Sequence, residues 1–333
     1  MKINWKVLFG FLVSLISIGI ILWNVDLAEV GKELVKANYL WFIPAIILNM
    51  AGTWAKSVRW QALLDNKIST SRSFWISNAG NLLNNVLPLR LGELSRAYLV
   101  SRNSNVTVMQ GLSTVIIERL LDVLTIFGML ILVIPFVPAG GFLVQSGTAL
   151  AAIAFIGVAG MFIAAALRTQ AMAVARFFLK PFPAKLSETL LKQGDEFLLG
   201  VSAAGGKRLL AGIFWSIITW LGWGGASYLM LLSFVPGAQL NVGIFVTCAL
   251  ALGLSIPSAP SGAGLYEAGA VAGLAVFGVP SNVALAYAIT AHLQSFILTG
   301  IFGTIGLDRE GESFSHLASA AQTVMASARP GDK

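Results

Sequence analysis

Between Leu209 and Leu307 the chain carries one formally charged side chain, that of Glu267. A carboxylate isolated among so many apolar residues costs a few kcal/mol at the centre of a bilayer unless it faces a partner or a cavity. Glu267 closely follows a helix-breaking run, Pro257-Ser258-Ala259-Pro260-Ser261-Gly262-Ala263-Gly264. Backbone freed from helical hydrogen bonds is tolerated at membrane depth only inside protein or along a watery cavity. Together, these two features predict a functional site at the break.

The whole chain shares this apolar character. Hydrophobic residues make up 56% and charged residues 11% of its 333 residues, whereas soluble domains are about 25% charged. The sequence is therefore that of an integral membrane protein. Its single cysteine, Cys248, rules out an intrachain disulfide.

Six apolar stretches are long enough to cross about 30 Å of hydrocarbon. They are Val7–Trp23, Tyr39–Ala55, Ser113–Phe136, Thr148–Leu167, Leu209–Phe234 and Val283–Leu307. Two further apolar segments, Phe74–Val100 and Gly243–Val279, are interrupted by proline and glycine, which favours a helix pair that enters and leaves on one side. We predict an all-α polytopic membrane protein with about six full spans and two oppositely inserted re-entrant helix pairs, arranged like an inverted repeat.

Lysine and arginine predict the orientation, because basic residues in short loops are retained on the cytoplasmic side. With the N-terminus inside, most basic loop residues collect on one face, and only Lys32 and Lys36 lie on the other. Both termini are then on the cytoplasmic side of an inner membrane. We predict an integral membrane domain over 1–307, with an interfacial cytoplasmic loop over 168–208, and a polar cytoplasmic tail over 308–333. The net charge of +7 reflects this topology and attraction to anionic lipid, without nucleic-acid binding.

Polar and charged residues of the first interrupted segment lie on both sides of its break. They are Asn81 and Asn85 before the break, Pro88 at it, and Arg90, Gly92, Glu93 and Arg96 after it. If a helix restarts there, the three charged residues are spaced three apart and share one face. This row is either a self-neutralising structural ladder, with asparagines bonding the interrupted backbone, or part of a binding site.

The second interrupted segment repeats this order, with Pro257, Pro260, Gly262, Gly264 and then Glu267. Paired interrupted segments in the two halves of a transporter point to a substrate site at their interface. The alternative interpretation is that these are two unrelated loops rich in helix breakers.

A third polar group, Glu118, Arg119 and Asp122, lies within one predicted span. Arg119 can pair with Asp122, three residues further on. The group either holds the neighbouring broken helix through Arg119 or receives a polar head group. Arg59 closes the second predicted span, where arginine commonly anchors a helix at the interface. By itself, Arg59 is therefore expected to act as an anchor.

Two histidines, His292 and His316, and one cysteine cannot build a zinc site. The sequence also has no phosphate-binding loop with lysine and no dinucleotide fingerprint within a strand and helix unit. No metal, cofactor or soluble catalytic domain is therefore expected. His292 and Gln294 are expected to have packing roles with satisfied hydrogen bonds.

Four ordered motifs resemble those of one known family. They are Arg59-Trp60-Gln61-Ala62-Leu63-Leu64, Asn85-Val86-Leu87-Pro88-Leu89-Arg90-Leu91-Gly92-Glu93, Glu118-Arg119-Leu120-Leu121-Asp122 and Pro260-Ser261-Gly262-Ala263-Gly264-Leu265-Tyr266-Glu267. The chain resembles the lysylphosphatidylglycerol synthase transmembrane-region family of flippase-like membrane proteins. In that family the membrane region is held to move a lipid between leaflets, while aminoacylation belongs to a separate soluble domain. The resemblance therefore implies that this chain moves a lipid between leaflets and does not synthesise it.

We therefore expect a flippase-like lipid transporter that moves an anionic or lipid-linked head group between leaflets through a lateral polar cleft. The expected substrate-binding residues are Arg59, Asn81, Asn85, Arg90, Glu93, Arg96, Glu118, Arg119, Asp122 and Glu267. The expected helix-break residues are Pro88, Gly92, Pro257, Pro260, Gly262 and Gly264. Arg90, Arg96 and Arg119 are expected to attract a phosphate. Glu267 is expected to bind a cationic or hydroxyl group, or to take a proton.

The expected partner is a membrane lipid, either a phospholipid or a polyprenyl-phosphate-linked lipid, with lipid-synthesis enzymes as further partners. Two other functions remain open from the sequence. One is a membrane-embedded transferase in which Glu267 or Glu93 acts as a general base on a lipid-linked donor. The other is a non-catalytic partner of lipid-synthesis enzymes. The lack of catalytic motifs favours the transporter.

Overall fold

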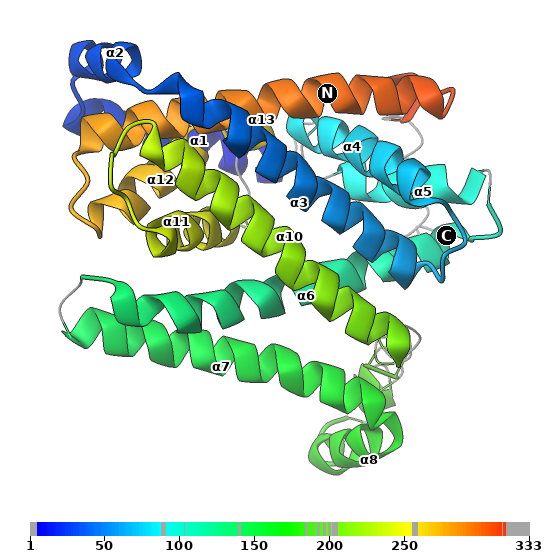
Figure 1. The fold of residues 1–333 in the computed structure, drawn as a ribbon. Helices are drawn as coiled ribbons and strands as arrows, with labels where there is room; N and C mark the ends of the chain where they lie inside the picture. Colours follow the sequence, from blue (N-terminus) through cyan, green and yellow to red (C-terminus); the bar gives the residue numbers. More distant parts are fainter. Residues whose placement is uncertain are drawn as a thin grey trace.

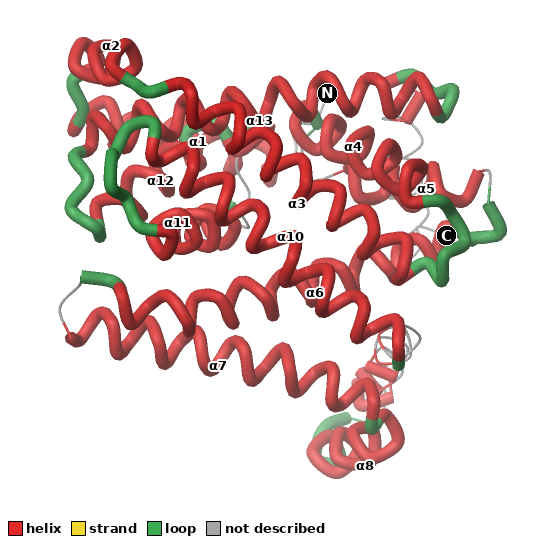
Figure 2. Tube along the Cα trace, in the orientation of Figure 1, coloured by secondary structure: helices red, strands yellow, loops and turns green. Residues whose placement is uncertain are grey.

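The structure is a computed structural model that describes residues 5–87, 91–102, 104–138, 141–183, 186–188, 190–191, 194–195, 198, 201, 206–254, 259–314 and 316–317. Its described residues form helices and connecting loops, without a strand (Figure 2). The predicted all-α class is confirmed for these residues.

The helices follow one another in the order drawn in Figure 1. Their bounds are α1 (Trp5–Asn24), α2 (Leu27–Lys36), η1 (Tyr39–Trp41), α3 (Phe42–Leu63), α4 (Thr70–Val86), α5 (Leu91–Arg102), α6 (Val108–Val133), η3 (Ile134–Phe136), α7 (Gly141–Ala166), α8 (Arg168–Leu179), α10 (Lys207–Leu232), α11 (Leu240–Gly253), η4 (Pro260–Gly262), α12 (Leu265–Ala275) and α13 (Ser281–Arg309). Each of the six predicted long stretches coincides with one long helix: α1, α3, α6, α7, α10 or α13.

Three described helices are long and apolar enough to cross a membrane by themselves: Gln110–Phe136, Lys207–Leu232 and Ser281–Arg309. The number rises to five if two bent pairs each count as one span. These pairs are Leu27–Lys36 with Tyr39–Leu63, bent by 71°, and Ala151–Ala166 with Arg168–Leu179, bent by 110°. The protein therefore has several apolar helices, and the count of six spans stays a prediction.

Backbone and side-chain hydrogen bonds define one end of the bundle, drawn at the left of Figure 1. The N–H of Asn38 donates to the carbonyl of Ser233 (2.9 Å), which joins the start of η1 to the end of α10. The N–H of Asp26 donates to Oδ1 of Asn282 (3.2 Å), which joins α2 to the start of α13.

Ion pairs define the opposite end. Asp65, after α3, pairs with Arg208 at the start of α10 (2.6 Å). Arg72 at the start of α4 pairs with Glu310 just after α13 (2.8 Å) and also donates to the carbonyl of Leu99 on α5 (3.3 Å). The starts of α4 and α10 and the ends of α3, α5 and α13 therefore lie together at this end.

The first interrupted segment forms a helix hairpin of α4 and α5. Their backbones approach so closely that a Cβ on Gly92 would overlap the carbonyl oxygen of Gly80. The side-chain oxygen of Asn84 accepts a hydrogen bond from the N–H of Gly92 (2.8 Å), which satisfies backbone left open by the break. The expectation that asparagine bonds the interrupted backbone is therefore confirmed for Asn84.

The second interrupted segment forms a hairpin of α11 and α12, in which a Cβ on Gly269 would lie 3.2 Å from Leu250. The turn before α12 contains Ser261, Gly262 and Gly264, all with positive φ (59°, 77° and 81°). Only glycine adopts such φ values without steric cost, so Ser261 is held by its surroundings. The η4 part of this turn packs against α4 of the first hairpin.

The two hairpins start from opposite ends of the bundle, because α4 begins beside the end of α13 and α11 begins after the end of α10 (Figure 1). This arrangement agrees with the predicted opposite insertion. Their depth in a bilayer, and hence the term re-entrant, stays a prediction.

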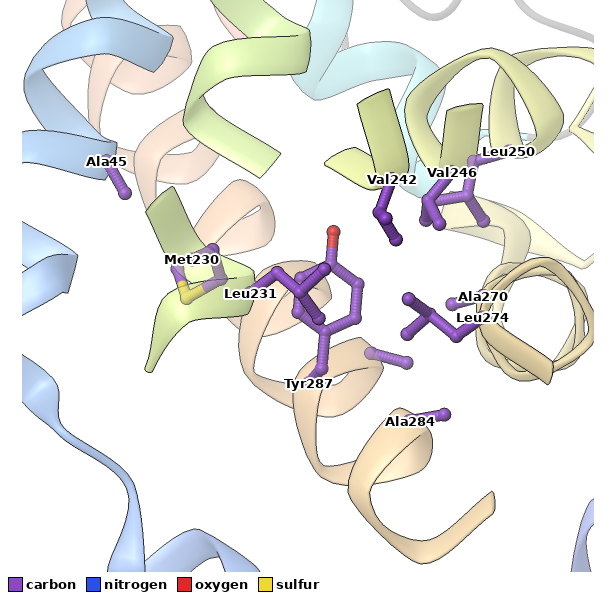
Figure 3. Packing of buried hydrophobic residues seen from close by; sticks show 11 residues of the cluster. Ala45, Met230, Leu231, Val242, Val246, Leu250, Ala270, Leu274, Ala284 and Tyr287 are labelled. Atoms are coloured by element: carbon purple, nitrogen blue, oxygen red, sulfur yellow. The ribbon is translucent and has the colours of Figure 1, made fainter. Parts of the chain in front are cut away.

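One hydrophobic core joins α10, α11, α12 and α13. In Figure 3 the ring of Tyr287 lies between Leu231 on α10 and Leu274 on α12, with Val246 on α11 beside them. The Tyr287 hydroxyl lies 2.7 Å from the hydroxyl of Ser227, so its polar end is paired. This core fixes the second hairpin against the long helices.

The chain after α13 packs back onto the first hairpin. Glu312 pairs with Arg102, and Leu317 is fully buried in a cluster that includes Leu99 and Val100. The helix itself continues two residues beyond the predicted boundary at Leu307, to Arg309. Most of the predicted tail over 308–333, and part of the predicted interfacial loop over 168–208, lie outside the described residues.

Candidate functional site

A cavity of about 350 Å³ lies inside the helix bundle. The first hairpin contributes Asn78 and Asn81 from α4 to its wall. The second hairpin contributes Thr247 and Leu250 from α11 and Tyr266 from α12. The two interrupted segments thus share one hollow.

Three long helices complete the wall of this cavity. They contribute Asn49 and Thr53 from α3, Trp220 and Trp223 from α10, and Gln294 from α13, among others. Every lining residue in the described part of the chain is uncharged at neutral pH. The wall therefore combines amides, hydroxyls and aromatic rings.

A cluster of buried charges, formed by Lys56, Arg59, Glu93, Arg96, Glu118, Arg119 and Asp122, lies next to the cavity; we call it the charge cluster. Arg59 on α3 is fully buried at its centre. Its guanidinium donates to Asp122 (2.6 Å) and Glu118 (2.9 Å) of α6 and to the hydroxyl of Ser216 on α10 (2.8 Å). The expectation that Arg59 anchors α3 at the membrane interface is therefore wrong.

Glu118 receives a second arginine from the α4–α5 hairpin. Arg96 on α5 donates to its other carboxylate oxygen at 2.8 Å, and both side chains are buried. The Arg96 guanidinium also lies 4.2 Å from the centre of the Trp60 ring, a cation–π contact. Glu118 therefore connects α3, α5 and α6.

Arg119 on α6 lies at the edge of the charge cluster and joins α6 to α5 of the first hairpin. It pairs with Glu93 on α5 (2.9 Å) and with Asp122 (3.4 Å). The predicted pairing of Arg119 with Asp122 is confirmed, and Arg119 also joins α6 to α5 through Glu93. Glu93 and Arg96 of α5 both pair across to α6. Arg90, the third member of the predicted ladder, lies outside the described residues, so the ladder stays a prediction.

Such a cluster fixes the geometry of the helices that meet in it. Removing charges from water carries a large desolvation cost, which is offset only where each group has good partners. Losing one member leaves the others buried without compensation, which is strongly destabilising. The charge cluster is therefore a framework that holds α3, α5, α6 and α10 in one arrangement.

Trp220 separates the charge cluster from the cavity. Its ring lines the cavity, and its indole N–H donates to Asp122 (3.0 Å). Trp223 packs edge-on against Trp220, with ring centres 5.3 Å apart. Lys56 lies behind Trp223, 5.9 Å from its ring centre. The two tryptophans thus form a wall with charges on one side and neutral polar groups on the other.

Glu267 lies at the start of α12, half-buried, and both of its carboxylate oxygens have partners. One oxygen accepts from the N–H of Gly264 (2.8 Å), as in a capping box. The other lies 2.6 Å from Nδ1 of His292 on α13. Nε2 of the same imidazole lies 3.2 Å from the carbonyl oxygen of Ser261. Glu267 and His292 therefore brace the strained turn.

Glu267 adjoins the cavity through Tyr266. The Tyr266 ring lines the cavity and stacks on the His292 ring with centres 4.4 Å apart. His292 therefore has the satisfied packing role predicted for it, while the side-chain oxygen of Gln294 is buried without a hydrogen-bond partner among the described residues.

The structure distributes the predicted site residues over three places. Arg59, Glu93, Arg96, Glu118, Arg119 and Asp122 meet in the charge cluster, Asn81 lines the cavity, and Glu267 lies at the turn with Pro260, Gly262 and Gly264. Asn85 is half-buried on α4, and Gly92 packs against Gly80. Pro88, Arg90 and Pro257 lie outside the described residues.

Sequence reasoning missed Lys56, Ser216, Trp220 and Trp223 as members or neighbours of this site. Lys56 and Arg59 are three residues apart on one helix face, a signal that could have placed both in the cluster. The tryptophans lie in the run Trp220-Leu221-Gly222-Trp223, whose pattern does not distinguish a cavity wall from packing. No group of three or more metal-binding side chains occurs in the described part of the chain.

The family model described as "Lysylphosphatidylglycerol synthase TM region" matches residues 7–303, which include all four motifs. UPF0104 membrane protein MJ1595 of Methanocaldococcus jannaschii is 25% identical over 318 residues, covering 89% of this chain and 92% of that protein. Glycosyltransferase AglD of Haloferax volcanii is 24% identical over 337 residues, covering 89% of this chain but 53% of that protein. No solved structure matches this chain.

Proposed function

Since the chain belongs to the lysylphosphatidylglycerol synthase transmembrane-region family, we propose that it is a membrane lipid transporter. It moves the polar head group of a lipid between leaflets through the cavity, while the acyl chains stay in hydrocarbon. The observation that carries this proposal is the cavity itself, a polar hollow between two hairpins that start from opposite ends of an apolar bundle. Sites of this kind at the interface of two interrupted segments are typical of transporters.

The α13 side of the cavity supports the path of the acyl chains. Ser295 lines the cavity and is itself exposed, and its neighbours Leu293, Phe296 and Ile297 are exposed apolar side chains. Exposed apolar residues on a helix of a membrane protein face lipid. A lipid can therefore place its head group at Ser295 and leave its chains against α13.

The charge cluster is the fixed part of this transporter. Its charges are buried and paired with one another, so they hold the helices around the cavity without taking part in transport by themselves. Arg119 is the exception, because its side chain is 38% exposed at the edge of the cluster. Among the arginines of the charge cluster it is the one with an accessible guanidinium, which can attract a lipid phosphate.

Blocking the cavity tests the proposal. Ala291 lines the cavity, so Ala291→Trp fills part of its volume. Leu293 is exposed two residues further on, so Leu293→Trp adds an indole on the outer surface of the same helix. Purified parent and variants are reconstituted in liposomes with fluorescent phosphatidylglycerol and a fluorescent glucosyl lipid, and lipid movement is measured by quenching of the outer leaflet.

The parent and Leu293→Trp are expected to move at least one labelled lipid, and Ala291→Trp is expected to reduce that rate by about tenfold or more. Equal melting temperatures show that the variants are folded. Equal rates in all three proteins, or no movement of any lipid by the folded parent, would contradict the proposal.

The similarity to Glycosyltransferase AglD favours one second candidate, a membrane-embedded transferase. This candidate needs a free carboxylate as general base. The carboxylates of Glu267 and Glu93 are both engaged, by His292 with Gly264 and by Arg119 respectively. Mass spectrometry separates the two functions, since a transferase yields a chemically altered lipid and a transporter yields the same lipid in the other leaflet.

A further inference from the structure

We propose that the cavity selects a neutral, hydroxyl-rich head group, of the glycosyl or polyol class, over a charged one. This inference rests on the proposed lipid transport and adds the chemistry of its substrate. It follows from the residues that line the cavity, from the wall that separates them from the charge cluster, and from one unpaired polar atom.

The lining of the cavity matches hydroxyl groups. Asn49, Asn78, Asn81 and Gln294 supply amides, each of which can both donate and accept. Hydroxyls of serine, threonine and tyrosine add further groups of the same dual kind. A sugar hydroxyl also donates and accepts, so each can pair with this wall in several ways. A phosphate only accepts and an ammonium only donates.

Among the described residues, the cavity wall contains no charge to compensate an ion. Trp220 covers Asp122, and Trp223 covers Lys56. The charges behind them are already paired with one another, with Arg59 bound to both Asp122 and Glu118. An ionic head group in the cavity would lose its hydration without gaining a counter-charge, which is unfavourable.

Aromatic rings and size also fit a small ring-shaped head group. Trp223 and Tyr266 line the cavity and are only partly buried, so their rings can pack on the apolar C–H face of a sugar. The volume of about 350 Å³ lies at the lower end of cavities that hold small organic ligands. It therefore suits one or a few sugar units and excludes a large oligosaccharide.

Gln294 provides independent evidence that a hydrogen-bond donor fits in the cavity. It lines the cavity, and its side-chain oxygen is buried without a partner among the described residues. Buried acceptors are nearly always paired in folded proteins, so an unpaired one at a cavity leaves a position for a donor from a ligand or a water. A hydroxyl of the head group would supply the donor.

A comparison of head groups on otherwise equal lipids tests this inference. Proteoliposomes contain fluorescent monoglucosyl diacylglycerol, phosphatidylglycerol or phosphatidylethanolamine with the same acyl chains. We expect the parent to move the glucosyl lipid about tenfold or more faster than either charged lipid, the effect of one or two hydrogen bonds. Asn81→Leu and Gln294→Leu are expected to reduce glucosyl-lipid transport by about tenfold each and to remove most of the preference.

Gln239→Leu is the matched control, because Gln239 is exposed before α11 and its side chain does not cap the helix. It is expected to keep the rate and preference of the parent. Faster or equal movement of phosphatidylglycerol or phosphatidylethanolamine by the parent would overturn the inference but leave lipid transport standing. No movement of any lipid would instead contradict the proposed transport function.

Equilibrium binding tests the inference even if the protein moves no lipid. It also distinguishes a lipid ligand from a free sugar. Tryptophan fluorescence of the detergent-solubilised protein reports binding, since Trp220 and Trp223 line the cavity. We expect the glucosyl lipid to bind about tenfold more tightly than phosphatidylglycerol. Tighter binding of phosphatidylglycerol would overturn the inference. Competition by methyl glucoside alone, at the same concentration as the lipid, would assign the cavity to a free sugar.

Discussion

At the scale of single residues, Glu118 has the largest number of charged neighbours in the described structure. Its two carboxylate oxygens bind Arg59 and Arg96, which come from two other helices. We predict that Glu118→Gln lowers the free energy of unfolding by about 3–5 kcal/mol, because two buried guanidinium groups lose their shared counter-charge. The loss is measured as a lower thermal midpoint in detergent.

The single cysteine provides the readout for this measurement. Cys248 is buried on α11, so a thiol-reactive dye labels it only after unfolding. Glu29→Gln is the control, because Glu29 pairs with Lys32 on the exposed surface of α2, where such pairs add little stability. A midpoint for Glu118→Gln that equals that of Glu29→Gln would show that the cluster does not hold the helices.

Glu267 allows a prediction about the strained turn. Glutamine keeps an oxygen that can accept from the N–H of Gly264, and alanine does not. We therefore expect Glu267→Ala to be less stable than Glu267→Gln by about 1 kcal/mol, the usual contribution of a helix cap. The same dye assay compares them. Equal midpoints for the two variants would mean that the contact with Gly264 does not stabilise α12.

Only short-range pairs could be predicted at this scale. Arg119 and Asp122 are three residues apart, so their pairing followed from helix geometry. Arg59 and Asp122 are 63 residues apart, and no local pattern connects them. The position of Arg59 at the end of an apolar stretch therefore led to its interpretation as an interfacial anchor.

At the scale of helices, the α4–α5 hairpin depends on two glycines in contact. A methyl group on Gly92 would overlap the carbonyl oxygen of Gly80. We predict that Gly92→Ala separates the two helices and lowers the free energy of unfolding by about 3 kcal/mol, at the upper end of overpacking costs, because backbone cannot yield as a side chain can. The thermal midpoint and the folded yield measure this effect.

Gly157→Ala is the matched control on α7. Gly157 is exposed, and a Cβ there would have no atom within 4 Å. Alanine in a helix is favoured over glycine by up to about 1 kcal/mol, so this variant is expected to be unchanged or more stable. If Gly92→Ala behaves in the same way, the close approach of the hairpin helices is not needed for folding.

Hydropathy and helix breakers predicted most elements, since each apolar stretch became one helix and each proline-glycine interruption became a hairpin. Apolar stretches and helix breakers are patterns of neighbouring residues, and the interactions that form or interrupt a helix also act between neighbouring residues. The bend of 110° between α7 and α8 was not predictable, because it depends on a turn that lacks a sequence signature.

At the scale of the whole molecule, the two ends of the bundle make a prediction about sidedness. Lys36 lies exposed at the end of α2, and Lys67 lies exposed after α3 at the opposite end. We expect a membrane-impermeant maleimide to label Lys36→Cys in intact cells, and to label Lys67→Cys only after permeabilisation. The buried Cys248 of the parent sets the background.

Labelling of both variants in intact cells would mean that the two ends of the bundle do not face opposite sides of the membrane. Labelling of Lys67→Cys alone would reverse the orientation predicted from basic residues. Either result would leave the fold unchanged, because hydrogen bonds and ion pairs define the two ends without reference to the membrane.

The family could be predicted from four motifs, and the match over residues 7–303 confirms it. The neutral lining of the cavity could not be predicted, since its described residues come from six helices and all of them except Tyr266 lie outside the four motifs. Sequence reasoning gave weight to charged residues because ions in a membrane are costly and therefore conspicuous. The structure places most of those charges in the framework around the cavity.

The contact between the start of α4 and the end of α13 has a consequence for biosynthesis. Arg72 and Glu310 are 238 residues apart, and α13 supplies a wall of the cavity. The hollow therefore stays open on one flank until the ribosome has made α13. A product terminated before this helix would present the polar lining of the cavity to lipid, which is costly at membrane depth.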